Sequence, residues 1–346
     1  MDLILVLFLC LIIIKIKNKR TVLYDFDSKS TLPLRGLLAI FIVFHHASQK
    51  CVLTTGNTIN RILFIPIEAF HTIGAPVVAV FFFLTGYGLA KSLKSNGRRY
   101  LRGFVPKRLG KILPEFLILT FLFIIIKDFV ETVSIEEIVE RMKDGYPPLP
   151  ASWFIYVILY TYLAFYFSAK ISKAELVKTG ILFTGLTIVG IIVVFILRFG
   201  GWWYISTPSI ITGYWIAVYE KRITPLMVKF NFIFDIAVCM IIGLSLLNSR
   251  IIDVLIINTV PILTYMIMRY LSFPQYKLLV FIGFISLEVY LVHGVILKFM
   301  IQYEVFQKFH PYISSLLLII VSILVAYGIK EIRNFFERRT YRSNIK

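Results

Sequence analysis

Apolar residues in this chain come in blocks of roughly 15–25 positions, with few charges inside them. A helix of this length crosses about 30 Å of hydrocarbon. The blocks lack the alternation of apolar and polar residues typical of membrane-barrel strands, so helices remain as the way to satisfy the backbone in lipid. The pattern therefore predicts an all-α, polytopic transmembrane helix bundle. The predicted spans are 2–16, 32–48, 67–90, 112–130, 152–169, 178–197, 208–219, 230–247, 251–268, 278–300 and 312–330.

Composition and charge favour a membrane bundle and predict its orientation. Hydrophobic residues make up 58% of the 346 positions, above the roughly 45–50% of a soluble domain. The net charge is +18, which in a soluble protein would indicate a nucleic-acid partner. Here 28 of the 37 Lys and Arg residues fall in alternate loops, as the positive-inside rule requires. This bias predicts eleven spans, or ten if 2–16 lies in the interface, a cytoplasmic C-terminus and no nucleic-acid partner.

The domain organisation follows from the same pattern. We expect one transmembrane domain over 1–346, in which 1–20 is an extra N-terminal hydrophobic segment with a basic flank. No internal repeat is visible, which argues against a transporter built from two similar halves. The loop at 131–151 is acidic, falls on the outside and is expected to carry a short amphipathic helix at 135–142. Three widely spaced cysteines indicate neither a disulfide framework nor a metal site.

An arginine and a histidine share one face of the span at 32–48. Arg35 and His46 are eleven residues apart, which is within about 20° of three helical turns and about 16 Å of rise. Arg35 then lies near the cytoplasmic end and His46 past the middle of the bilayer. Ionisable groups inside a membrane are costly and are functional candidates by default. The alternative is that Arg35 snorkels as a topology anchor and His46 bonds a neighbouring helix.

A basic segment follows the third span. Arg98 and Arg99 are explained by the positive-inside bias alone. Arg108 and Lys111 are three residues apart on one face of the following helix. Such a pair would suit a polyphosphate ligand such as the nucleotide end of a coenzyme.

A second polar stretch lies late in the chain. Ser286, Tyr290 and His293 share a face, and Glu288 projects roughly opposite. They form either a buried polar network that joins helices or part of a catalytic site. Earlier, the segment Phe81-Phe-Phe-Leu-Thr-Gly86 carries a glycine that would let another backbone or a ligand come close.

Together these motifs resemble the acyltransferase 3 family. The resemblance rests on an arginine, ten residues and a histidine, then on Phe-Phe-Phe-Leu-Thr-Gly, Lys-Arg-x-x-Lys-Ile-x-Pro, Pro150-x-x-Trp153-Phe154 and Ser-Leu-Glu-Val-Tyr-Leu-Val-His. It runs from about 31 to 331. Family members are bacterial membrane acyltransferases, many of which O-acetylate surface polysaccharides. The resemblance thus implies a multi-pass protein of the bacterial cell membrane.

The resemblance also implies roles for individual residues. His46 matches the catalytic histidine and Arg35 its partner, while Ser286, Glu288, Tyr290, His293 and Gly86 would support them. Arg108 matches the first arginine of an Arg-x-x-Arg motif, but the second is Lys111 here, which keeps the charge and loses the bidentate fork.

The expected function is O-acyl transfer, most often acetyl transfer, from cytoplasmic acyl-CoA to an exopolysaccharide or capsular polysaccharide or its lipid-linked precursor. Acetyl-CoA would be a co-substrate, with no tightly bound cofactor and no metal. The expected partners are this donor, the glycan and membrane lipids. His46 would act as general base or carry the acyl group. A polysaccharide exporter and a non-catalytic scaffold are the two alternatives.

Overall fold

The computed structural model divides the chain into two compact units. Unit 1 comprises 1–31, 75–111 and 154–274, and unit 2 comprises 32–74, 112–153 and 275–346. The two predicted spans at 2–16 and 230–247 lie outside the described residues. Whether the units act as the single domain predicted over 1–346 stays a prediction. The structure describes residues 23–55, 61–62, 65–66, 70–130, 133–229, 250–271 and 273–343.

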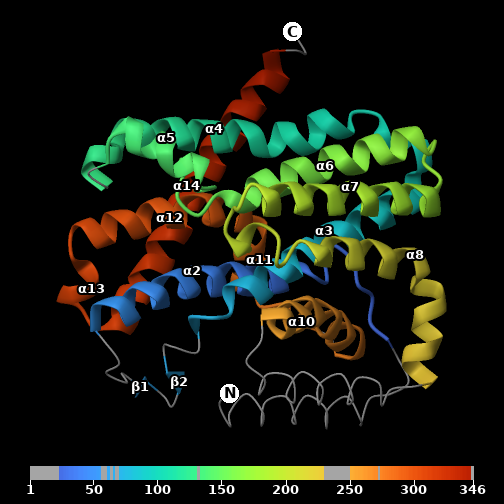
Figure 1. The fold of residues 1–346 in the computed structure, drawn as a ribbon, viewed down its shortest axis with the longest axis horizontal. Helices are drawn as coiled ribbons and strands as arrows, with labels where there is room; N and C mark the ends of the chain where they lie inside the picture. Colours follow the sequence, from blue (N-terminus) through green and yellow to red (C-terminus); the bar gives the residue numbers. More distant parts are fainter. Residues whose placement is uncertain are drawn as a thin grey trace. The chain divides into compact units, whose positions relative to one another are not determined.

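Each of the remaining predicted spans contains helix (Figure 1). The long helices are α2 (Leu32–Thr55), α3 (Gly74–Asn96), α4 (Phe104–Val130), α6 (Trp153–Ile171), α7 (Leu176–Ile196), α8 (Pro208–Lys229), α10 (Arg250–Tyr270), α12 (Ser286–Gln302) and α14 (Pro311–Ser343). The shorter elements are η2 (Gly97–Leu101), α5 (Ile135–Lys143), η3 (Gly201–Trp203), α11 (Lys277–Phe284), α13 (Val305–Lys308) and the antiparallel strands β1 (Arg61–Ile62) and β2 (Ile65–Pro66).

The helices α8 and α14 run ten and thirteen residues past the predicted ends of their spans, and two other predicted spans were wrong. The third begins at Gly74, seven residues later than expected. The predicted continuous helix at 278–300 is two helices, α11 and α12, bent by 77° at Ile285. The Ser286 hydroxyl donates to the Gly283 carbonyl at this break, 3.0 Å away, so a side chain occupies one acceptor of the last turn of α11.

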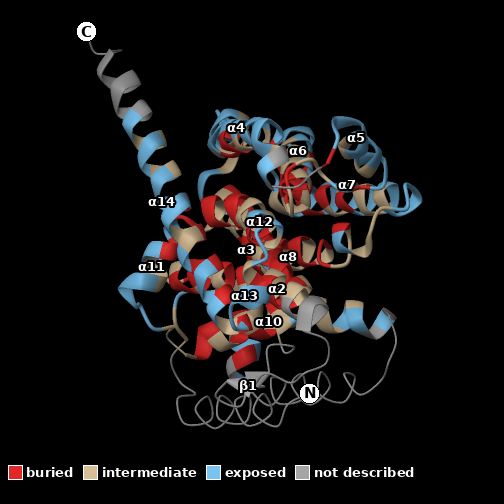
Figure 2. Ribbon diagram, turned by 90° about the vertical axis from the view of Figure 1, so that its left-hand side faces the viewer, coloured by how far each residue is buried: buried red, intermediate tan, exposed pale blue. Residues whose placement is uncertain are grey.

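Several helices have the length and apolarity of membrane spans. Within the described residues, five helices are each long and apolar enough to cross a membrane. The bent pair α11–α12 makes a sixth if it is counted as one span. Figure 2 shows α4 largely exposed, and its exposed side chains include Leu117, Phe121 and Ile125. Apolar groups exposed along a helix of this length match a lipid environment rather than water. The chain thus has the character of a multi-pass membrane protein.

Unit 1 contains a close helix crossing between α3 and α8. A Cβ placed on Gly86 would overlap the Ile210 carbonyl oxygen, and one on Gly213 would overlap the Phe83 carbonyl oxygen. Each helix therefore contributes a glycine that lets the other backbone approach, as small residues do in membrane interfaces. Of the two possibilities at Gly86, the structure shows an approaching backbone.

Unit 2 is built around α2, against which α11, α12 and α14 pack (Figure 1). Its core includes Val43, Ile282, Val289 and Leu318, all buried. At the α2–α11 crossing, a Cβ on Gly36 would overlap the Leu279 carbonyl oxygen, so the two backbones touch one residue away from Arg35. The crossing fixes the end of α2 that carries Arg35 against the bent pair.

The short helix α5 confirms the amphipathic segment predicted at 135–142. Ser134 caps its start by accepting a hydrogen bond from the Glu137 backbone amide at 3.1 Å. Acidic residues occupy its first turn and basic residues its last, which suits the helix dipole. The chain then leaves the helix through Gly145, whose φ is +81°.

Candidate functional site

The helix α2 carries both residues of the predicted catalytic pair. It runs unbroken from Leu32 to Thr55, so Arg35 and His46 lie on one face about 16 Å apart along the axis. Both side chains are partly exposed. His46 thus lies on a helix that packs against α11, α12 and α14.

His46 stacks on a second histidine from the bent pair. Its ring lies 5.1 Å from the ring of His293, centroid to centroid, with the planes 29° apart. The Nδ1 atom of His46 lies 3.2 Å from the side-chain oxygen of Gln49. Because that oxygen can only accept, Nδ1 donates and the Nε2 atom of His46 keeps its lone pair.

His293 is fully buried on α12. Its Nδ1 atom donates to the Tyr290 carbonyl at 2.7 Å, and its Nε2 atom has no hydrogen-bond partner among the described residues. The Tyr290 hydroxyl donates in turn to the Ala151 carbonyl at 2.5 Å. Two features that the sequence presented separately, on α2 and α12, thus meet within unit 2.

The neighbouring His45 is held in a different way. Its Nδ1 atom donates to the Phe70 carbonyl at 3.0 Å, and its ring lies so close to Gly74 that a Cβ there would overlap it. The His45 and His46 rings are 4.9 Å apart. Three imidazoles therefore gather beside the middle of α2, and His45 is fixed by the segment that precedes α3.

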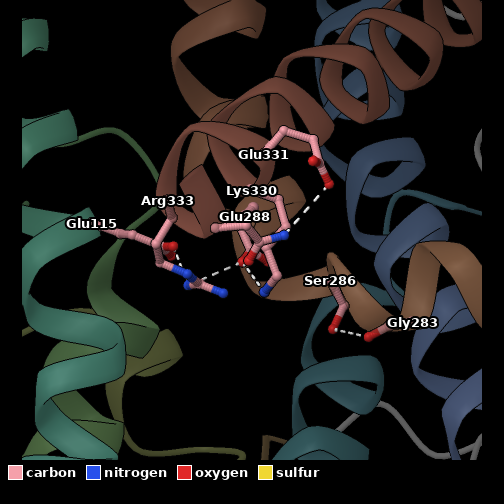
Figure 3. Close-up of polar contacts among 8 residues, drawn as sticks. Glu115, Gly283, Ser286, Glu288, Lys330, Glu331 and Arg333 are labelled. Atoms are coloured by element: carbon pink, nitrogen blue, oxygen red, sulfur yellow. Dashed lines mark hydrogen bonds and ion pairs between the residues drawn. The ribbon is translucent and has the colours of Figure 1, made fainter. Parts of the chain in front are cut away.

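Glu288 lies in a buried cluster of charges on α4, α12 and α14 (Figure 3). One of its oxygens accepts from Lys330 at 2.6 Å and lies 3.3 Å from Arg333. Arg333 also pairs with Glu115 of α4. Two carboxylates and two cations balance each other here, so this face of α12 joins helices, as the polar-network alternative for the stretch anticipated.

Arg108 and Lys111, the predicted coenzyme pair, belong to unit 1. The Arg108 guanidinium donates to the Tyr100 hydroxyl at 2.8 Å and lies 5.7 Å from the centre of the Tyr162 ring. Lys111 is exposed. The guanidinium is thus held between two tyrosines near the start of α4, whereas Arg35 and His46 belong to unit 2.

Two carboxylates of importance were not singled out from the sequence. Glu115 joins the cluster around Glu288. In unit 1, Glu220 accepts from Tyr87 at 2.7 Å and pairs with Lys91 at 2.8 Å, and Arg269 lies 3.6 Å away. Glu115 interrupts an apolar block, and the rule that charges within a membrane have partners would have marked it. Glu220 follows the predicted span at 208–219 and stands beside Lys221, so its position gave no such signal.

This arrangement can perform proton transfer or nucleophilic attack. His46 offers a lone pair at Nε2 and is partly exposed, which are the properties of a general base or a nucleophile. His293 is buried, so it acts on a substrate only indirectly, through its stacking contact with His46. The assignment of catalytic roles to these residues stays a prediction.

The comparisons with known proteins give one match. The family model for an Acyltransferase domain matches residues 34–331 of this chain. This range covers nearly the whole chain and includes the predicted site residues on both units. No curated protein and no solved structure matches the chain.

Proposed function

This chain belongs to the acyltransferase 3 family and is an acyltransferase, and we propose that it moves an acetyl group from cytoplasmic acetyl-CoA to a hydroxyl of a surface polysaccharide. The acceptor is an exopolysaccharide, a capsular polysaccharide or a lipid-linked precursor. The protein would lie in the bacterial cell membrane. The basic loops and the C-terminus would face the cytoplasm, as the distribution of Lys and Arg indicates.

The stacked pair of His46 and His293 carries this proposal. A histidine that only joined helices would be buried with both nitrogens satisfied, whereas His46 is partly exposed and its Nδ1 atom is fixed by Gln49. Fixing one nitrogen of an imidazole orients the other for proton transfer. The second imidazole, 5.1 Å away, covers one face of the His46 ring.

The reaction balances without any other reactant. The sugar hydroxyl oxygen forms a bond to the thioester carbonyl carbon, and the carbon–sulfur bond breaks. The hydroxyl proton passes to Nε2 of His46 and then to the departing sulfur. If His46 instead attacks the thioester, the acyl group rests on Nε2 before the hydroxyl takes it.

The donor would be held from the cytoplasmic side. Arg108 and Lys111 would bind the phosphates of the coenzyme, because they share a face near the start of α4 and Arg108 is already oriented by Tyr100. Arg35 would position the donor on the same face of α2 as His46. These assignments rest on the family motif and on charge.

The test measures the acetyl-CoA dependence of transfer by the purified full-length protein in lipid nanodiscs. Arg108→Ala and Lys111→Ala should each raise the KM for acetyl-CoA about tenfold or more, because each loses a charge-assisted contact. Lys107→Ala, an exposed neighbour, should leave it unchanged. Equal KM values in all three variants would refute the donor site. A deletion strain that lacks the polysaccharide itself, rather than its acetyl esters, would indicate an exporter instead.

A further inference from the structure

Unit 2 contains a pocket that the donor side of the proposed reaction does not use. Its volume is about 280 Å³, close to the lower end of small-ligand sites, about 300 Å³. It is formed by the end of α4, by α5, by the segment that follows α5 and by α12. Its lining includes Phe123, Lys127, Arg141, Tyr146, Ala151 and Lys298.

The charged residues that line the pocket are basic, whereas the loop that contributes most of its wall is acidic. The loop at 131–151 is acidic, yet the charged residues among the described ones that line the pocket are Lys127, Arg141 and Lys298. Lys127 also donates to the Val133 carbonyl at 2.8 Å. Only nine Lys and Arg residues fall on the predicted outer side, and three of them meet here. On the exposed surface of α5, a carboxylate oxygen of Glu137 lies 2.7 Å from the Arg141 guanidinium. Such a gathering of cations is typical of a site for an anion.

The remaining walls are flat and apolar. Phe123 and Tyr146 contribute rings, and Pro147, Pro148 and Pro150 contribute pyrrolidine faces. Pockets for small ligands combine such surfaces with a few placed polar groups. The C–H face of a pyranose packs on surfaces of this kind, and the volume suits one sugar unit rather than a long chain.

The floor of the pocket connects directly to the histidines. Ala151 has a left-handed backbone, with φ of +60°, and its carbonyl accepts the Tyr290 hydroxyl at 2.5 Å. Tyr290 provides the carbonyl that His293 binds, and His293 stacks on His46. A Cβ on Gly294 would press on the Pro150 carbonyl, so α12 and the pocket floor are in contact. Tyr290 therefore links a residue that lines the pocket to the stacked histidines.

We propose that this pocket binds the acyl acceptor as a sugar that carries an anionic group, either a phosphate or a carboxylate. The proposal rests on the proposed function and on the predicted orientation, in which the pocket opens to the outside while acetyl-CoA enters from the cytoplasm. Lys127, Arg141 and Lys298 bind the anionic group. The apolar walls hold the ring beside Ala151, whose carbonyl binds Tyr290.

The test uses saturation-transfer-difference NMR on the full-length protein in nanodiscs. The probes are glucose 1-phosphate and glucuronic acid, which separate phosphate from carboxylate, and glucose is the neutral comparison. At least one anionic probe should bind, and glucose should bind about tenfold more weakly or not at all. Lys298→Gln and Lys127→Gln should weaken the anionic probe by a similar factor, whereas Lys298→Arg and the distant Lys308→Gln should retain it.

The proposal is overturned if glucose binds as well as the anionic probes, if anionic binding survives both glutamine substitutions, or if none of the three probes binds. His46→Ala separates the two proposals, because it should abolish transfer and leave probe binding intact. Binding without any transfer in the wild type would reject the proposed function alone. Transfer to a glycan with no probe binding would reject the pocket alone.

Discussion

Removing the charge of Glu288 should destabilise the fold strongly. Its carboxylate is 1% exposed and lies within 3.3 Å of both Lys330 and Arg333. Together with Glu115 these groups are balanced, so Glu288→Gln leaves one net buried positive charge. Breaking a buried ion pair by removing one partner costs about 3–5 kcal/mol. A second substitution, Lys330→Gln, restores the balance and should recover part of this loss.

The assay compares the free energy of unfolding of the variants in detergent micelles. Glu140→Gln is the control, because Glu140 is an exposed acid outside the cluster whose pair with Lys143 faces solvent, and it should change stability little. Glu288→Gln protein that remains folded should retain acyl transfer, since the cluster joins helices. A Glu288→Gln variant as stable as the wild type, or a double variant less stable than the single one, would refute the reasoning from charge balance.

Three further predictions follow from the packing and the charge pattern. Gly36→Ala should destabilise the α2–α11 crossing by about 1–3 kcal/mol, because its Cβ would overlap a backbone oxygen. In contrast, Gly88→Ala, with no atom within 4 Å, should unfold at the same temperature as the wild type or a higher one, because alanine favours a helix interior over glycine. Tyr290→Phe should raise the acceptor KM and spare the acetyl-CoA KM, which steady-state kinetics would separate; equal effects on both would contradict a role through the pocket floor. Single cysteines at positions Lys94 and Glu137 should react with an impermeant thiol reagent from opposite sides of intact cells and inverted vesicles, and labelling from one side would contradict the predicted topology.

Hydrophobic blocks predicted where the helices lie but not how they bend. Block length and the 100° period are properties of one helix, so α2 and the α5 segment were placed well from sequence. The 77° break at Ile285 lies inside one predicted continuous span, and no proline marks it. It depends on a side-chain cap by Ser286 and on tertiary packing, which periodicity does not report.

The candidate site was predictable in its residues and not in its contacts. His46 and His293 were each marked as polar groups within apolar spans, but 247 positions separate them and only the fold shows that they stack. Glu115 was missed because a single acid beside Pro114 gave no pattern with a partner. The basic pocket was hidden for a related reason, since Lys127, Arg141 and Lys298 come from three separate segments of an otherwise acidic surface.

The central claim is that the partly exposed imidazole of His46 performs acyl transfer, and one comparison tests it most directly. The rate of acetyl transfer from acetyl-CoA to the isolated surface glycan is measured for purified His46→Ala and His45→Ala proteins of equal thermal stability. His46→Ala should lose at least about 10²–10⁴ in rate, as expected for the loss of a general base, whereas His45→Ala, held by Phe70 and Gly74, should lose far less. Transfer by His46→Ala at the wild-type rate would contradict the claim.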